Sequence, residues 1–286
     1  MLSIRRLASL ALLVSSALGA QLTQVNNYGE NPTGVQMWVY VPDNRPQNPA
    51  VIVAMHWCTG TAQAYYSGTQ YARQADSKGF IVIYPDAPDS GGCWDVHSDA
   101  TLRHDAGGDS KAIASMVKYA IQNYGADPNK IFMTGTSSGA MMVNVLAGSY
   151  PDLFKAGSAN AGVPFGCFRG QDMWHSQCAN GQVSKSAQQW GDDVRNAYPG
   201  YGGPRPKMLL FHGANDDTLR YPNYNEALKQ WSNVHGVSLT STKQNTFQNG
   251  YTESIYGNGE VVGYSVGNGP HNLPAHEDKV LAFFGL

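Results

Sequence analysis

The chain has 286 residues, of which 42% are apolar and 14% are charged. This fits one large domain or two small ones with a substantial buried core, and it excludes a disordered or collagen-like chain. Lys and Arg number 19 against 21 Asp and Glu, a formal net charge of −2. Without an excess of cations to neutralise phosphates, the chain is not expected to bind nucleic acid.

Residues 1–20 have the pattern of a secretory signal peptide. Arg5 and Arg6 precede the apolar run Leu7–Leu18, which is too short to span a bilayer. Small residues follow, and we expect cleavage after Gly19 or Ala20. No later apolar run is long enough to cross a membrane. The sequence therefore predicts a soluble protein, secreted to the extracellular space, with no membrane partner.

Short apolar runs alternate along the chain with segments whose apolar residues have helical spacing. The expected strands are Val35–Val41, Ala50–Met55, Phe80–Tyr84, Lys130–Gly135, Phe154–Ala159 and Lys207–Phe211. The expected helices are Ala62–Ser77, Asp109–Tyr124, Ser138–Gly148, Ser184–Ala197, Tyr221–Val234 and the tail Pro274–Phe284. This alternation predicts an α/β fold with a mostly parallel central sheet and helices on both faces.

Local signals mark several ends of these elements. Asp109 is the expected N-cap of its helix, and Gly125 is the expected C-terminal stop. Gly257-Asn258-Gly259 is a turn signal between the expected hairpin strands Tyr251–Tyr256 and Glu260–Val266. We find no repeat and no linker that would tether a separate binding module, so residues 21–286 are predicted to form a single domain.

The segment Gly135-Thr136-Ser137-Ser138-Gly139 is a G-x-S-x-G motif in the context that this motif requires. A strand pattern precedes it and a helical pattern follows. The small flanking residues permit a sharp turn that lifts the Ser137 hydroxyl out of the sheet, and the helix N-terminus favours developing negative charge. The motif therefore predicts a nucleophilic serine at Ser137.

In this fold an acid and then a histidine follow the serine in chain order. Asp216 and Asp217 lie just beyond an expected strand, where the acid belongs. The local sequence does not decide which of the two aspartates is the acid. Among the later histidines, His235 ends a helical stretch, and His276 begins one and is expected on the surface. His271 lies in a loop that can bring its imidazole over the sheet, so it is the predicted base.

Two backbone N–H groups are expected to form an oxyanion hole. The loop after the strand Ala50–Met55 supplies one of them, and the residue after the nucleophile supplies the other. The predicted donors are Cys58 and Ser138.

Five segments carry a family resemblance: His56–Ala62 (HWCTGTA), Cys93–Val96 (CWDV), Gly107–Ser110 (GGDS), Gly135–Met142 (GTSSGAMM) and His271–Pro274 (HNLP). Together they resemble the fungal acetylxylan esterases of carbohydrate esterase family one, relatives of feruloyl esterases and extracellular polyhydroxybutyrate depolymerases. The resemblance covers essentially the whole mature chain, and the order and spacing of the segments make it specific.

The resemblance implies an α/β-hydrolase fold and a cofactor-independent enzyme that removes acetyl groups from acetylated xylan or xylo-oligosaccharides. The family's catalytic serine, aspartate and histidine fall on Ser137, Asp216 and His271, which resolves the choice of acid. Two positions depart from the family: some relatives have glycine where Trp57 stands, and Pro270 occupies a position that is often glycine. We expect the protein to be a monomer.

Three alternative functions fit the sequence less well. A feruloyl esterase would use the same triad on a bulkier aromatic acyl group, which Trp57 is expected to crowd. A metal-dependent deacetylase needs clustered ligands, but the histidines are scattered without a His-Glu-x-x-His motif, so no metal site is predicted. A carbohydrate-binding protein on an inactive hydrolase fold would lack a member of the triad, and none is missing.

The four cysteines favour two disulfides in an oxidising compartment, and their number alone permits three pairings. Cys58 and Cys93 both follow strands of the expected parallel sheet, so both emerge at its carboxyl-end face. Cys167 and Cys178 bracket one short glycine-containing segment. The predicted bridges are therefore Cys58–Cys93 and Cys167–Cys178.

Three tryptophans are candidates to bind substrate, and packing in the core is the alternative for each of them. Trp57 follows the strand that leads into the oxyanion loop, and Trp94 and Trp174 lie in long loops expected over the same face of the sheet. A neutral sugar chain offers C–H faces and hydroxyls, on which indole rings can stack. Trp57 is also expected to keep the acyl pocket small.

Overall fold

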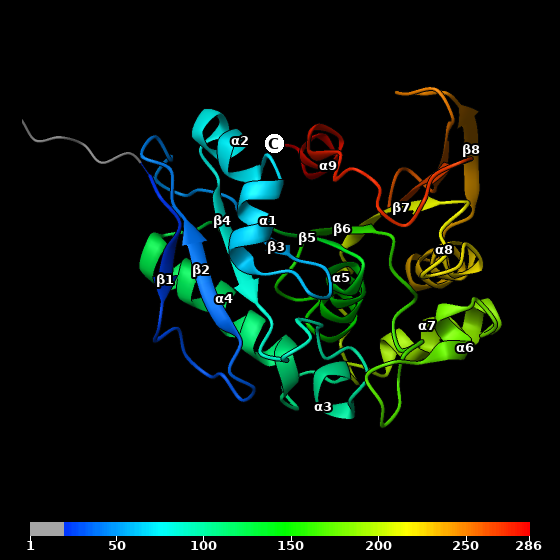
Figure 1. The fold of residues 1–286 in the computed structure, drawn as a ribbon, viewed down its shortest axis with the longest axis horizontal. Helices are drawn as coiled ribbons and strands as arrows, with labels where there is room; N and C mark the ends of the chain where they lie inside the picture. Colours follow the sequence, from blue (N-terminus) through cyan, green and yellow to red (C-terminus); the bar gives the residue numbers. More distant parts are fainter. Residues whose placement is uncertain (1–19) are drawn as a thin grey trace, which may run out of the picture.

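A computed structural model describes residues 20–286 of the chain. Except for Ala20, the predicted signal peptide lies outside the described residues. Within residues 20–286, ten strands form one sheet, and helices pack on both of its faces (Figure 1). No helix in this range is long and apolar enough to cross a membrane.

The strands form a sheet in the order β1-β2-β4-β3-β5-β6-β7-β10-β9-β8. Their bounds are β1 (Thr23–Val25), β2 (Gln36–Tyr40), β3 (Val51–Met55), β4 (Ile81–Asp86), β5 (Ile131–Thr136), β6 (Ala156–Asn160), β7 (Lys207–Gly213), β8 (Leu239–Gln244), β9 (Tyr251–Tyr256) and β10 (Val261–Val266). The helices are α1 (Ala62–Gly68), α2 (Tyr71–Lys78), α3 (Asp99–Leu102), α4 (Gly108–Tyr124), α5 (Ser138–Ser149), α6 (Ser176–Ala179), α7 (Ala187–Arg195), α8 (Pro222–His235) and α9 (Glu277–Phe284).

The centre of the sheet is parallel and its edges are antiparallel. Strands β4, β3, β5, β6, β7 and β10 pair in parallel, each with its neighbour in the sheet. Strands β1 and β2 on one side, and β9 and β8 on the other, join antiparallel. The predicted hairpin is the β9–β10 pair, and its turn glycines Gly257 and Gly259 have positive φ. The predicted α/β fold with a mostly parallel sheet is confirmed.

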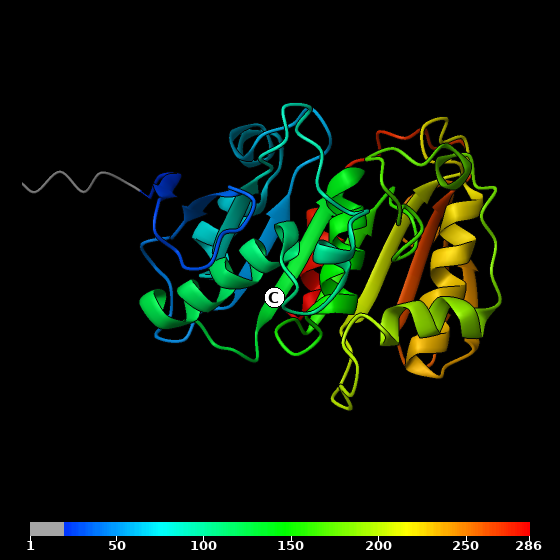
Figure 2. The same ribbon diagram turned by 90° about the horizontal axis from the view of Figure 1, so that it is seen from below.

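The sheet separates two hydrophobic cores, and alternate residues of each central strand serve one or the other. In β3, Val51, Val53 and Met55 pack in the core with α4, α5, α7 and α8. Ile52 and Ala54 face the opposite core, with α1, α2 and α9. Figure 1 shows the second group of helices above the sheet, and Figure 2 shows the first group in front of it. Coverage of both faces explains why these strands are apolar throughout.

Two strands, β1 and β8, and a break in one predicted helix were not expected from the sequence. β1 and β8 were not predicted because they are short or polar and largely exposed, with no apolar alternation. The predicted helix Ala62–Ser77 is two helices, α1 and α2. The Thr69 hydroxyl donates to the Tyr65 carbonyl at 2.7 Å, and the Gln70 N–H donates to Glu277 at 2.8 Å. These side-chain partners replace helical hydrogen bonds and end α1.

Asp109 does not cap its helix, contrary to the prediction. Gly107 is the N-cap of α4, and Asp109 lies buried within the first turn. Its carboxylate accepts from the Asp95 N–H at 2.9 Å. Burial raises the pKa of this carboxyl group. Asp109 therefore braces the loop before α3 rather than the start of its own helix. The predicted C-terminal stop is observed, since Gly125 caps α4 in the left-handed conformation.

Both predicted disulfides are present. Cys58–Cys93 joins the loop after β3 to the loop after β4, and Cys167–Cys178 closes a loop with a sequence separation of 11 residues. The second bridge encloses the segment that carries Trp174. It therefore limits the conformations open to this segment in the unfolded chain.

Removing the Cys167–Cys178 bridge should destabilise the protein. Replacing both cysteines by serine should lower the free energy of unfolding by about 2–4 kcal/mol, because the unfolded chain regains the conformations that the bridge excludes. Urea unfolding of the variant and the parent under oxidising conditions measures the difference. An unchanged unfolding midpoint would contradict this expectation.

Candidate active site

Ser137 lies at a sharp turn between β5 and α5, with a φ of 56° and a ψ of −117°. A Cβ atom on Gly135 would lie 2.4 Å from the Gly139 carbonyl carbon. A Cβ atom on Gly139 would lie 2.3 Å from the Met55 carbonyl oxygen. Only glycine fits at both positions, so the turn can pack against β3 and hold Ser137 in its strained backbone conformation.

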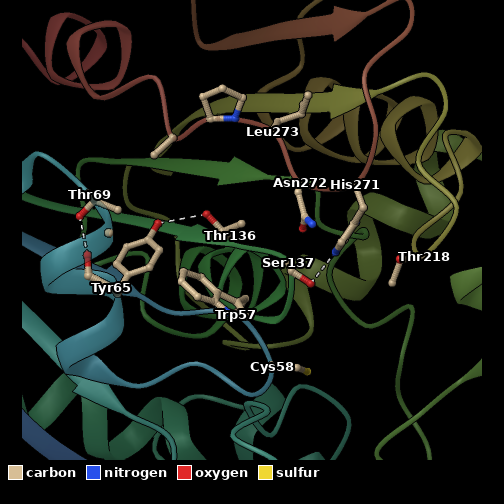
Figure 3. Close-up of a pocket in the computed structure, with 13 residues that line it drawn as sticks. Trp57, Cys58, Tyr65, Thr69, Thr136, Ser137, Thr218, His271, Asn272 and Leu273 are labelled. Atoms are coloured by element: carbon tan, nitrogen blue, oxygen red, sulfur yellow. Dashed lines mark hydrogen bonds between the residues drawn. The ribbon is translucent and has the colours of Figure 1, made fainter.

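The structure brings together the three residues predicted to form the triad. The Ser137 hydroxyl lies 2.9 Å from Nε2 of His271 (Figure 3). Nδ1 of His271 lies 2.7 Å from Oδ2 of Asp216. With Nδ1–H donating to the carboxylate, Nε2 is free to accept the serine proton. This is the geometry of a nucleophile, a base and a group that orients the base.

Asp216 is buried and fully hydrogen bonded, whereas Asp217 is exposed. Oδ1 of Asp216 accepts from the N–H groups of Thr218 and Leu219 at 2.9 and 2.8 Å. Nε2 of His212 lies 3.2 Å from Oδ2 of Asp216. Burial alone would raise the pKa of Asp216, but these hydrogen bonds and the one from His271 hold its pKa well below the usual range.

Because its pKa is lowered in the folded state, ionised Asp216 stabilises the folded protein. Its contribution is fully present above the unfolded-state pKa of about 3.9, and it is lost as the pH falls toward the folded-state pKa. The acid is therefore ionised throughout the neutral pH range, where it can orient and stabilise a protonated His271.

The other two late histidines lie away from the serine. His235 ends α8, and its Nε2 donates to the Pro206 carbonyl at 2.9 Å. His276 precedes α9 and, instead of being an ordinary surface residue, is half-buried. Its Nε2 lies within hydrogen-bond distance of the Tyr251 hydroxyl, at 2.8 Å, and its ring packs against Phe247. Neither imidazole is among the residues that line the cavities at Ser137.

Two cavities meet at Ser137. The first, which we call the histidine-side cavity, has a volume of about 580 Å³ (Figure 3). It is lined by Trp57, Cys58, Tyr65, Gly68, Thr69, Thr136, Ser137, Thr218, His271, Asn272, Leu273, Pro274 and Ala275. The second, which we call the methionine-side cavity, has a volume of about 370 Å³. It is lined by Cys58, Asp89, Gly91, Cys93, Trp94, Val96, Ser137, Ser138, Met141, Phe168, Met173, Trp174, Thr218 and Leu219.

The two predicted oxyanion donors lie beside Ser137. Cys58 lines both cavities, and Ser138 lines the methionine-side cavity. Among residues 20–286, the backbone N–H groups of Cys58 and Ser138 have no hydrogen-bond acceptor. The Ser138 side chain accepts from the Trp94 N–H at 2.9 Å. The arrangement leaves two donors available for an oxygen atom next to the serine.

The three predicted substrate-binding tryptophans lie in different environments. Trp57 is half-buried in the histidine-side cavity, and Trp174 is 52% exposed at the methionine-side cavity. Trp94 is fully buried, and its Nε1–H donates to the His56 carbonyl at 2.8 Å. For Trp94 the structure shows the alternative, core packing, because a ring without exposed surface cannot stack on a sugar. Trp94 instead holds the His56 carbonyl at the start of the loop after β3.

Several cavity residues were not predicted from the sequence. Tyr65 is on α1, and its hydroxyl is 3.1 Å from the Thr136 hydroxyl. Met141 comes from the first turn of α5, and Thr218 follows the acid. Thr136 and Thr218 could have been found because each lies within two residues of a predicted catalytic residue. Tyr65 had no such signal, since a buried tyrosine on an amphipathic helix is ordinary core.

In the part of the chain that the structure describes, no group of three or more His, Cys, Asp and Glu side chains is arranged to hold a metal ion.

Comparisons with known proteins identify relatives of this chain. Residues 37–237 match the family model described as esterase PHB depolymerase. The chain is 48% identical to the probable acetylxylan esterase A of Aspergillus niger, over 93% of this chain and 89% of that protein. It is also 48% identical to acetylxylan esterase A of Emericella nidulans, over 93% of this chain and 90% of that protein.

Solved structures give the same picture. An acetyl xylan esterase from Aspergillus awamori superposes with a TM-score of 0.91 at 46% identity, covering 93% of this chain and 99% of that one. An S-formylglutathione hydrolase from Agrobacterium tumefaciens has a TM-score of 0.54 at 15% identity, covering 94% of each chain. The second likeness concerns the fold alone.

The two adjacent aspartates should differ sharply in their effect on turnover. Asp216→Asn should lower kcat by about 10³-fold or more, because the amide cannot hold His271 in the required tautomer. Asp217→Asn is the matched control, because it removes an exposed carboxylate that is adjacent to Asp216 in the sequence. It should have little effect on kcat. Steady-state kinetics on 4-nitrophenyl acetate measures both variants, and the reverse ranking would exchange the two roles.

Proposed function

The chain belongs to the esterase PHB depolymerase family, and we propose that it removes acetyl groups from acetylated xylan as a serine esterase. One observation carries the proposal: the hydrogen-bonded series from Ser137 through His271 to Asp216, with distances of 2.9 and 2.7 Å, opens into a cavity. The 48% identity to acetylxylan esterases over nearly the whole chain supports the substrate class.

The proposed reaction begins with attack of Ser137 on the ester carbonyl carbon. His271 takes the serine proton, and Asp216 stabilises the resulting imidazolium. The carbonyl oxygen becomes negative and accepts hydrogen bonds from the N–H groups of Cys58 and Ser138. His271 then gives its proton to the leaving sugar oxygen, and the C–O bond to the sugar breaks. An acetyl group remains on Ser137.

Water completes the cycle by the same steps. His271 removes a proton from a water molecule, which attacks the acetyl carbon, and the oxyanion donors again hold the negative oxygen. Collapse of this intermediate breaks the bond to Ser137, whose oxygen recovers a proton from His271. Acetic acid leaves and loses its proton to solvent water, and the chain's residues return to their starting protonation states.

The position of His271 assigns the two cavities to the two parts of the ester. The leaving sugar oxygen must lie close to His271, because it receives its proton from Nε2. His271 lines the histidine-side cavity, so we assign that cavity to the sugar. The methionine-side cavity contains both oxyanion residues but not His271, so we assign it to the acyl group.

The linings of the cavities fit this assignment. The histidine-side cavity has no Lys, Arg, Asp or Glu among its lining residues. Besides the His271 imidazole, it presents hydroxyl, amide and aromatic groups. These groups suit the hydroxyls and C–H faces of a neutral sugar chain. The lining of the methionine-side cavity is mostly apolar and includes Met141, Met173 and Trp174, which suit an acyl group, and Asp89 is the one carboxylate among its lining residues. Trp57 then contacts the sugar rather than limiting the acyl pocket.

We further propose that the protein is secreted and acts as a monomer of one catalytic domain, residues 21–286. Its two disulfides support an oxidising compartment. The ten-stranded sheet is continuous from β1 to β8, and all three proposed catalytic residues follow strands of this one sheet, which supports a single domain.

Acetate release should depend on Ser137 and should exceed ferulate release. On acetylated and feruloylated xylan measured side by side, the parent should release mainly acetate. Ser137→Ala and His271→Ala should each reduce turnover by about 10³-fold or more, because the first removes the nucleophile and the second removes its base. Near-parental acetate release by either variant would refute the mechanism, and dominant ferulate release would favour the feruloyl esterase alternative.

The cavity assignment predicts opposite effects for two tryptophans. Trp174→Ala should raise kcat/KM for 4-nitrophenyl butyrate relative to acetate by about tenfold or more, because it enlarges the acyl side. Trp57→Ala should leave this ratio nearly unchanged and should raise KM for acetylated xylo-oligosaccharides. If Trp57→Ala shifts the acyl preference and Trp174→Ala does not, the two cavities have the reverse roles.

A further inference from the structure

The peptide unit between Trp57 and Cys58 is held by its carbonyl oxygen. Nδ1 of His56 lies 2.7 Å from the Trp57 oxygen, and the Gly60 N–H donates to the same oxygen at 3.0 Å. A carbonyl oxygen only accepts hydrogen bonds, so Nδ1 of His56 carries a proton. Two donors therefore fix the direction of this carbonyl group.

In a trans peptide unit the C=O and the following N–H are part of one plane and point in opposite directions. Holding the Trp57 carbonyl therefore also fixes the Cys58 N–H. We propose that His56 is a positioning residue for the oxyanion hole, and that its Nδ1–H directs the Cys58 N–H toward the oxygen that becomes negative at Ser137. This inference rests on the proposed function, because it concerns an acyl-transfer transition state at Ser137.

The other ring nitrogen of His56 fixes the tautomer. Nε2 accepts from the Ala87 N–H at 3.1 Å, and an N–H group can only donate. The ring is therefore neutral with its proton on Nδ1. Oδ1 of Asp86 lies farther from Nε2, at 3.4 Å. The Ala87 amide at the end of β4 thus selects the tautomer that can hold the Trp57 carbonyl.

The surroundings leave His56 little freedom to move. Its side chain has no exposed surface, and its ring centroid lies 4.9 Å from that of Trp94. The Trp94 indole also donates to the His56 carbonyl, so both the ring and the backbone of His56 are held.

Gly60 permits the close approach of the two donors to the Trp57 oxygen. A Cβ atom at this position would lie 2.8 Å from the Trp57 oxygen and 3.1 Å from Nδ1 of His56. A side chain at this position would displace the carbonyl, so glycine is required for the arrangement that directs the Cys58 N–H.

Two amide substitutions separate the roles of the two ring nitrogens. In His56→Asn, the side-chain NH₂ replaces Nδ1–H and can still donate to the Trp57 oxygen, whereas the acceptor for Ala87 is lost. In His56→Gln, the longer side chain can accept from Ala87, whereas the donor to Trp57 is lost. Each variant loses one buried hydrogen bond, so a purely structural role would affect both alike.

We expect His56→Gln to lower kcat for 4-nitrophenyl acetate by about 10- to 100-fold with little change in KM, because an oxyanion donor acts mainly in the transition state. His56→Asn should stay within about threefold of the parent. An aryl trifluoromethyl ketone provides a second measurement, since Ser137 adds to its carbonyl and forms a stable oxyanion adduct. Its affinity should fall in the Gln variant by the same factor as kcat.

Equal kcat values in the Asn and Gln variants, with thermal unfolding showing that both are folded, would overturn the proposal. If either variant fails to fold, Gly60→Ala tests the same point, because its Cβ displaces the Trp57 oxygen. It should also lower kcat at unchanged KM, and a folded Gly60→Ala variant with parental kcat would overturn the proposal. A fully active Ser137→Ala variant would instead refute the proposed function, whatever the His56 variants show.

Discussion

The strained backbone at Ser137 is the constraint on which the rest of the site depends. Its positive φ is maintained because α5 begins directly against the end of β3, where Gly139 lies within contact of the Met55 and His56 carbonyls. This close packing places the loop after β3 beside the serine and so brings Cys58 next to Ser138. The strain of one residue is thus offset by the packing of two strands and a helix.

The sequence predicted the central fold well because its physical signals are strong there. β3 and β5 are buried on both faces, and this requires unbroken apolar runs that are easily recognised. The edge strand β8 has no such requirement, because most of its side chains are exposed and its stability comes from pairing with β9. The end of α1 was also unpredictable, since it depends on Glu277, which is distant in sequence from Gln70.

The site was predicted in part, for a related reason. Ser137 and His271 could be placed because the turn motif and the chain order of the fold restrict where they can stand. Trp94 was misplaced because an indole in a glycine-rich loop has the same local sequence whether it faces solvent or supports the loop. Its burial depends on His56 and Ser138, to which its N–H groups donate. No local pattern contains that information.

The order of the strands in the sheet has a consequence for how the protein reaches its active state. The proposed base follows β10, which inserts beside β7 only after β8 and β9 have been passed in the chain. Ser137 and His271 are separated by 134 positions, so their contact closes one of the long loops of the fold, which is slow. A chain that emerges N-terminus first would complete the serine turn well before its base arrives. During synthesis, hydrolytic competence should therefore appear only after β10 and His271 have emerged.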